Sequence, residues 1–303
     1  MASYNQTWFS LVGFKVNSFL LQLCIFSALL LVYIFCLLGN ILTIIILTIN
    51  EHLQTPLYFF LKNLAILDIC LSSCTVPKLL VIFMSMDEYI SFSGCMLQLY
   101  FYVSVGSTGF YILVLLSLDR YVAICQPLRY NTLLPIQLCR KLVTFAWVLG
   151  FLEFIPVIFL ISQLDWCSSR VVIDHFFCDG STLIHVSCSN TDIVENIFFS
   201  FASITILVSF LPTLSSYCFI ISAVLRISSS TGRRKMFSTC SSHSIVVSIA
   251  YGCCIFIYVR PAGNASSSHE KTVAIFNSIL APLLHPLIYT LRNQSVIHGL
   301  KHM

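Results

Sequence analysis

Seven long apolar stretches run through this chain, and each is long enough to cross a lipid bilayer. A membrane helix needs about 20 mostly apolar residues, and backbone polar groups in lipid must be satisfied within the segment, so such runs are expected to be helices. Only 9% of the 303 residues are charged while 58% are hydrophobic, and so few charges cannot cover the surface of a water-soluble protein. The sequence therefore predicts an all-α membrane protein, a seven-transmembrane helix bundle. The expected spans are about 24–49, 57–83, 96–122, 141–161, 196–225, 237–259 and 271–291.

Lysine and arginine are distributed unequally between the two sets of loops that connect these spans. Because cytoplasmic loops carry the excess of basic residues, the richer set is expected inside. It holds Arg120, Arg129, Arg140, Lys141, Arg226, Arg233, Arg234, Lys235, Arg292 and Lys301, against Lys15, Lys78, Arg170, Arg260 and Lys271. The amino terminus is thus predicted outside and the carboxyl terminus inside, with residues 1–23 as an extracellular tail, 24–291 as the bundle and 292–303 as a short cytoplasmic tail.

Four of the fourteen cysteines lie in polar surroundings on the predicted outer side: Cys95, Cys167, Cys178 and Cys188. An oxidising compartment favours disulfides there, and four thiols allow two bridges in three connectivities. The remaining cysteines fall mostly in apolar runs and are interpreted as small core residues. The outer tail also contains the sequon Asn5-Gln6-Thr7, so Asn5 is a predicted glycosylation site.

Acidic residues inside the spans are candidates for function, because an ionisable group in the membrane is costly. Asp68 is the only acid in the second span, and Glu153 lies in the fourth. Asp68 is interpreted as an ion site, a proton relay or a polar hub. For Glu153 two interpretations stay open, one in which it lines a pocket and one in which it packs as a neutral or paired group.

Several ordered motifs resemble those of the vertebrate olfactory receptors, which are rhodopsin-like G protein-coupled receptors. The most specific is the run LDRYVAICQPLRY from Leu118 to Tyr130. The others are Gly39-Asn40, PLYFFL from Pro56 to Leu61, Ser216-Tyr217, KMFSTCSSH from Lys235 to His243, PLLHPLIY from Pro282 to Tyr289, and Arg292-Asn293. Together these motifs extend over about 250 residues.

The resemblance implies an odorant cavity between helices 3, 5, 6 and 7, covered by the loop 162–195. Helical spacing then selects the lining residues Tyr102, Val103, Gly106, Ser107, Phe201, Thr205, Tyr251, Cys254, Ile255, Tyr258 and Ser278. Aromatic rings and methyl groups there would bury a small, mostly apolar molecule, and a few hydroxyls would orient it. For Tyr102 and Tyr258 a second interpretation is the aromatic belt at the outer interface.

The resemblance also implies the disulfide pairs Cys95–Cys178 and Cys167–Cys188, although a Cys95–Cys188 link stays open. It further implies a switch that couples the ligand to a stimulatory G protein of the olfactory type and so to cyclic AMP. Its expected residues are Asp119, Arg120, Tyr121, Tyr217, His243, Pro286 and Tyr289. The expected location is the plasma membrane of olfactory sensory neuron cilia.

The chain departs from the family pattern at three places. Leu116-Ser117-Leu118 replaces the usual Met-Ala-Tyr, Gly109 replaces a frequent glutamate, and His285 replaces the asparagine of Asn-Pro-x-x-Tyr. A polar hub of Asn40, Asp68 and His285 is expected, in which an imidazole stands beside Asp68. We therefore assign no metal and no cofactor.

The sequence argues against three other functions and leaves a fourth open. A transporter built from duplicated halves predicts an internal repeat, which the sequence lacks. An enzyme predicts a cluster of nucleophile, base or metal ligands, but His243 and His285 stand in no such cluster in the sequence. A nucleic-acid partner has no support, because no basic stripe exceeds Arg233-Arg234-Lys235. A chemosensory receptor outside the nose remains the alternative, since sequence does not report the tissue.

Overall fold

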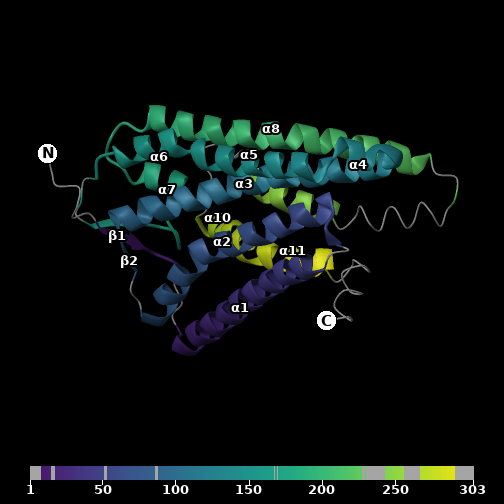
Figure 1. The fold of residues 1–303 in the computed structure, drawn as a ribbon. Coiled ribbons are helices and arrows are strands. Elements are labelled where there is room, and N and C mark those ends of the chain that lie inside the picture. The colour runs from purple at the N-terminus through teal and green to yellow at the C-terminus, as the bar shows by residue number, and fades with distance from the viewer. Residues whose placement is uncertain are drawn as a thin grey trace.

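Long helices that run side by side form most of the computed structural model (Figure 1). The structure describes residues 8–14, 18–50, 53–85, 88–166, 168, 170–226, 229, 243–255 and 267–290. The long helices are α1 (Phe19–Ile49), α2 (Pro56–Ser85), α3 (Phe92–Cys125), α5 (Ile136–Leu152) and α8 (Asp192–Leu225). The shorter helices are α4 (Tyr130–Leu133), α6 (Ile155–Ser162), α7 (Gly180–His185), α10 (Ser267–Ile275), α11 (Ala281–Thr290) and the unlabelled helix His243–Ile255.

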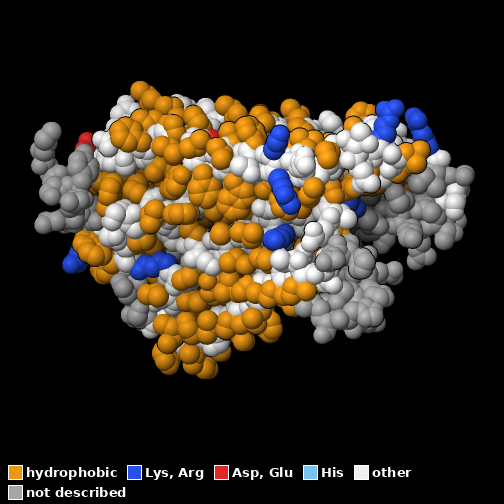
Figure 2. Space-filling model, viewed as in Figure 1, with side chains coloured by type: hydrophobic (Ala, Val, Ile, Leu, Met, Phe, Trp, Pro, Cys, Tyr) orange, Lys and Arg blue, Asp and Glu red, His pale blue; other side chains and the backbone are white. Residues whose placement is uncertain are grey.

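Six helical segments of the described chain are long and apolar enough to cross a membrane, and the shorter helix His243–Ile255 lies within the sixth expected span. The predicted all-α membrane bundle is therefore confirmed. Exposed apolar side chains such as Phe19, Leu20 and Phe35 cover the outer face of α1. Figure 2 shows that hydrophobic side chains dominate the middle of the molecule on the face in view, as expected for a surface in contact with lipid.

Helix α3 lies at the centre of the bundle and packs against α2, α5 and α8. In Figure 1 it runs between α8 and α5 on one side and α2 on the other. Ser91 caps its start by accepting a hydrogen bond from the Gly94 backbone N–H at 3.2 Å, which satisfies one of the free donors of a helix terminus. Its buried residues lie on several faces and include Leu99, Ile112 and Leu116, so several neighbouring helices pack around α3.

The fourth expected span, 141–161, is not one continuous helix. It consists of α5 and α6, separated by a turn at Glu153 and Phe154. Pro156 explains the break, because proline removes a backbone donor and its ring clashes with the carbonyl four residues earlier. The last span is irregular as well, since a π-helical turn (Phe276–Leu280) joins α10 to α11.

A small sheet, which the sequence analysis did not predict, lies at one end of the bundle; we call this the sheet end (Figure 1). Strand β1 (Trp8–Leu11) is central, with β2 (Tyr89–Ser91) antiparallel on one side and β3 (Arg170–Ile173) parallel on the other. Part of the predicted tail 1–23 is thus paired with two loops. We call the opposite end, where α3 finishes in the Asp119-Arg120-Tyr121 cluster, the far end.

Candidate functional site

A cavity of about 110 Å³ lies inside the bundle and is lined mainly by apolar side chains. This volume is of the same order as the apolar cavity of about 150 Å³ that holds benzene, so the space is of the size of a small molecule. The walls come from α2, α3, α8, the helix His243–Ile255 and the last span. The lining residues are Leu64, Leu67, Asp68, Leu71, Tyr102, Val103, Val105, Gly106, Ser107, Gly109, Phe110, Leu113, Phe154, Phe198, Ala202, Thr205, Ile206, Ala250, Cys254, Asn277, Ala281, Pro282 and His285.

Six of the residues expected to line the cavity do so in this structure. They are Tyr102, Val103, Gly106 and Ser107 of α3, Thr205 of α8, and Cys254. Tyr258, which was expected with them, lies outside the described residues.

Phe201, Tyr251, Ile255 and Ser278 were also expected to line the cavity, but they do not. Ile255 is 42% exposed, and Tyr251 packs against Phe110 and Phe210 at centroid distances of 5.0 and 5.2 Å. Ala250 and Cys254 face the cavity instead. The face of this helix that lines the cavity is therefore rotated by about one residue, or 100°, from the face that was expected to line it.

The other two residues are held elsewhere. The Ser278 hydroxyl donates a 2.6 Å hydrogen bond to the Ala274 carbonyl of its own helix. Phe201 packs against Phe154, with ring centroids 6.3 Å apart. Both are next in sequence to residues that line the cavity, Asn277 and Ala202.

The wall from α2 was missed by the sequence analysis, which expected the cavity between helices 3, 5, 6 and 7. Asp68 of this wall is buried, and its two carboxylate oxygens lie 2.9 and 3.0 Å from Nδ1 of His285. The presence of an acid in the apolar second span was the one signal for this wall. Its apolar members, such as Leu64 and Leu67, have no feature that separates them from ordinary core residues.

The expected polar hub is connected through α1. Asn40 donates from Nδ2 to the carbonyl oxygens of Pro282 at 3.0 Å and Cys36 at 2.9 Å. Gly39 beside it permits this close approach, because a Cβ atom there would lie 3.3 Å from Pro286. Among the described residues, no three His, Cys, Asp or Glu side chains are grouped closely enough to hold a metal ion.

Glu153 gathers three hydroxyl groups behind one wall of the cavity. The Ser107 hydroxyl donates to Oε1, and the Tyr111 hydroxyl donates to Oε2 at 2.6 Å. Thr205 Oγ1 lies 3.4 Å from Oε1. Ser107 and Thr205 line the cavity, while Glu153 does not. Of its two interpretations, the structure therefore favours the one in which Glu153 is paired behind the wall.

Tyr102 connects the cavity to the loop 162–195. Its hydroxyl is hydrogen-bonded to Asn277, another lining residue. Its ring packs against Phe177 of the loop with a centroid distance of 4.5 Å. Because Phe176 and Phe177 are both fully buried, the loop forms the cover of the bundle at the sheet end.

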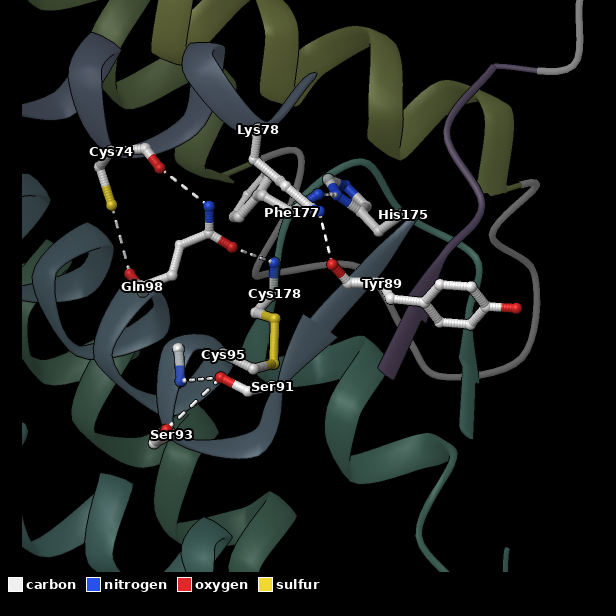
Figure 3. Close-up of a disulfide and its surroundings, with 11 residues drawn as sticks. Cys74, Lys78, Tyr89, Ser91, Ser93, Cys95, Gln98, His175, Phe177 and Cys178 are labelled. Carbon is white, nitrogen blue, oxygen red and sulfur yellow. Dashed lines mark hydrogen bonds between the residues drawn. A yellow bond between two sulfur atoms is a disulfide. The ribbon is translucent and has the colours of Figure 1, made fainter. Parts of the chain in front are cut away.

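A disulfide joins Cys95 at the start of α3 to Cys178 in this loop, with the Cα atoms 5.4 Å apart (Figure 3). Gln98 supports it from one turn further along α3. Its Nε2 donates to the Cys74 carbonyl at 2.8 Å, and its Oε1 accepts from the Cys178 backbone N–H at 2.9 Å. Cys188 is also disulfide-bonded. Cys167 and the expected glycosylation site Asn5 lie outside the described residues.

Lys271 ties together three segments at the sheet end. Its Nζ donates to the carbonyls of Val12 and Gly13 at 3.2 Å and lies 2.5 Å from Asp174. The Lys271 side chain is only 8% exposed, whereas that of Asp174 is 54% exposed. The lysine therefore depends on these acceptors, since an unpaired buried ammonium is costly.

The far end holds the expected switch residues of α3. Arg120 Nη2 lies 2.5 Å from Asp119, and Tyr130 of α4 donates to the same carboxylate at 2.5 Å. Burial and this hydrogen bond raise the pKa of Tyr130, so its hydroxyl remains a donor. Arg120 is thereby held against its own helix, with α4 fixed to it.

Of the remaining switch residues, Tyr121, Tyr217 and His243 make contacts between helices. The hydroxyl of Tyr217 contacts His243 Nδ1, which joins α8 to the helix His243–Ile255. Tyr121 packs against Phe219 of α8 with ring centroids 5.7 Å apart. The side chain of Tyr289 lies outside the described part of the structure.

The family model described as olfactory receptor matches residues 29–303. The human protein olfactory receptor 6C3 is 46% identical over 284 residues, which cover 93% of this chain and 91% of that protein. Human olfactory receptor 6C70 is 43% identical over 296 residues, covering 98% and 94%. Human olfactory receptor 2AP1 is 42% identical over 283 residues, covering 93% and 91%.

Proposed function

This chain belongs to the olfactory receptor family, and from that premise we propose that the cavity between α2, α3 and α8 is where it binds a small, mostly apolar odorant. The proposed ligand contacts are the expected residues that line the cavity, with the α2 wall added. The observation that carries the proposal is the cavity itself, which has apolar walls and a few hydroxyl groups. Such a lining buries a small apolar molecule and orients it with few hydrogen bonds.

The protein is a multi-pass plasma-membrane receptor, and we propose that its sheet end faces outside. The disulfide Cys95–Cys178 lies at this end, and disulfides persist in oxidising compartments. In this orientation the part of the predicted tail 1–23 that precedes α1 is extracellular, and residues 292–303 are cytoplasmic. The expression site that we propose is the cilia of olfactory sensory neurons.

For signalling, we propose that an agonist favours a second packing of the bundle by contacting it more strongly than the first. The contacts that would change are Arg120 with Asp119 and Tyr217 with His243. A cleft opened at the far end would accept a stimulatory G protein of the olfactory type, which raises cyclic AMP. The chain is thus a signalling receptor and not an enzyme, with an odorant, a G protein and the bilayer as its partners.

A panel of volatile compounds tested on transfected cells, with cyclic AMP as the readout, examines this function. The structure provides a blocking variant, because a Cβ atom at Gly106 would meet no atom within 4 Å and would point into the lined space. We expect Gly106→Leu to fill the cavity and lower the potency of agonists at least tenfold, since about 1.4 kcal/mol is a factor of ten.

Gly252→Leu is the matched control. This glycine is exposed and also has no atom within 4 Å of a Cβ position, but it does not line the cavity. We expect wild-type potency from it at equal surface level. Equal potency of Gly106→Leu and the wild type would place the odorant elsewhere, and a panel without any agonist would contradict the proposed function.

A further inference from the structure

One wall of the cavity presents hydroxyl groups whose protons are already engaged inside the protein. Ser107 of α3 and Thr205 of α8 line the cavity, and both are buried. Ser107 donates its proton to Glu153. Thr205 Oγ1 lies 2.9 Å from the Phe201 carbonyl and 3.4 Å from Glu153, so its single proton points to an acceptor of the protein in either case.

The direction of these hydrogen bonds determines what the wall offers to a ligand. A hydroxyl group has one proton and two lone pairs, and an ionised carboxylate only accepts. Because the protons of Ser107 and Thr205 point away from the cavity, their oxygens offer lone pairs to it. The wall therefore accepts hydrogen bonds and does not donate them.

Four other polar side chains of the cavity form two hydrogen-bonded pairs. The Tyr102 hydroxyl bonds to Asn277, and Asp68 bonds to His285. A ligand that carries only acceptor atoms thus meets no donor at the Ser107–Thr205 wall. A polar acceptor left without a partner in such a place costs binding free energy.

We propose that Ser107 and Thr205, oriented by Glu153, make this receptor selective for small aliphatic alcohols and amines over ethers and ketones of the same shape. The O–H or N–H group of the ligand donates to the wall, and the hydrocarbon part fills the apolar space. Glu153 is a positioning residue here, since it touches the hydroxyls and does not line the cavity. The inference rests on the proposed function, because it assumes that the odorant occupies this cavity.

The experiment compares aliphatic primary alcohols and amines with the methyl ethers and methyl ketones of matched length, using cyclic AMP output at equal surface level. For the wild type we expect alcohols and amines to be about fivefold or more potent than the matched ethers and ketones, as one hydrogen bond implies. Ser107→Ala and Thr205→Val remove the acceptors and should abolish this difference.

Glu153→Gln is the decisive variant, because its amide can donate to Ser107 and release the hydroxyl proton toward the cavity. We expect ethers and ketones to gain potency, so that the preference for alcohols shrinks or reverses. Glu195→Gln on α8 and Ser215→Ala on the exposed side of α8 make the same chemical changes outside the cavity, and both should keep the wild-type ranking.

The possible results distinguish a failure of the proposed alcohol and amine selectivity from a failure of the proposed receptor function. If agonists are found but ethers match alcohols on the wild type, or if Glu153→Gln leaves the ranking unchanged at normal surface level, the inference is wrong and the receptor function stands. If Gly106→Leu has no effect on these same agonists, the cavity itself is not the binding site. If Glu153→Gln does not reach the surface, the ranking on Ser107→Ala and Thr205→Val decides.

Discussion

His175 shows how the burial of one side chain sets its protonation state. Its ring lies 4.7 Å from the ring of Phe176 and 4.5 Å from that of Phe177, and the side chain is buried. Burial, with the nearby Lys271 charge, lowers the pKa of His175 to about 4, although Asp179 and Asp174 act in the opposite direction. The imidazole is therefore neutral in the folded protein at neutral pH.

We predict that this histidine makes the cover of the bundle sensitive to acid. In the unfolded chain the pKa is about 6.5, so below that pH the unfolded state binds a proton that the folded state does not. The stabilisation is complete above about pH 6.5 and is lost as the pH falls toward 4, by about 2 kcal/mol at pH 5. Thermal unfolding of the purified receptor should show this slope, and His175→Gln should flatten it. The exposed His185 is the control, and an unchanged slope in His175→Gln would refute the assignment.

At the scale of elements, a glycine sets how closely α5 approaches α3. Gly150 of α5 faces Thr108 of α3, and a Cβ atom at Gly150 would lie 2.2 Å from Thr108 Oγ1 and 2.9 Å from its backbone nitrogen. Membrane helices commonly meet through such residues, because small side chains let backbones approach closely. Gly150 cannot be singled out from the sequence, since a glycine in an apolar run looks the same whether it faces a helix or lipid.

We predict that Gly150→Ala separates α5 from α3 and lowers the thermal stability of the receptor, because one of the two backbones must move. A cost of about 1–3 kcal/mol is expected from overpacking. Gly252→Ala is the matched control, as its Cβ meets open space; it should be neutral or stabilising by up to about 1 kcal/mol through helix propensity. Melting temperatures of the two variants in the same detergent test this, and equal values would show that the α3–α5 contact is not tight.

At the scale of the whole molecule, α3 reaches from the disulfide at Cys95 to the switch residues Asp119 and Arg120. Tyr102 of the cavity and Arg120 of the far end are eighteen residues apart, or about 27 Å along a helix. Packing against α2, α5 and α8 means that a shift of α3 is felt by every neighbour. The two ends are thus separated in space but joined by a single rigid element.

We predict that Arg120→Ala keeps ligand binding and surface level but removes cyclic AMP output, because the variant changes only the far end. Binding of an agonist from the panel to the purified protein and cyclic AMP in cells are the two measurements. Gly106→Leu should give the opposite pattern, with weak binding and a normal far end. Full signalling by Arg120→Ala would show that its expected role does not apply to this chain.

The sequence alone determined the class of this protein, because hydrophobicity is a local property that adds up along a segment. Runs of about 20 apolar residues specify membrane helices whatever their neighbours are. The Asp119-Arg120-Tyr121 motif and the outer cysteines could likewise be read from position alone.

Contacts between distant segments were decided only by the tertiary structure. Glu153 meets Ser107 across 46 residues, and Asp68 meets His285 across 217. Strand β1 pairs with β2 and β3, which no local pattern indicated. Such contacts depend on the rotation and tilt of each helix. In an apolar segment the rotation and tilt are set by packing against neighbouring helices, because no polar face marks one side. A rotation of about 100° is enough to place Ala250 at the cavity where Tyr251 was expected.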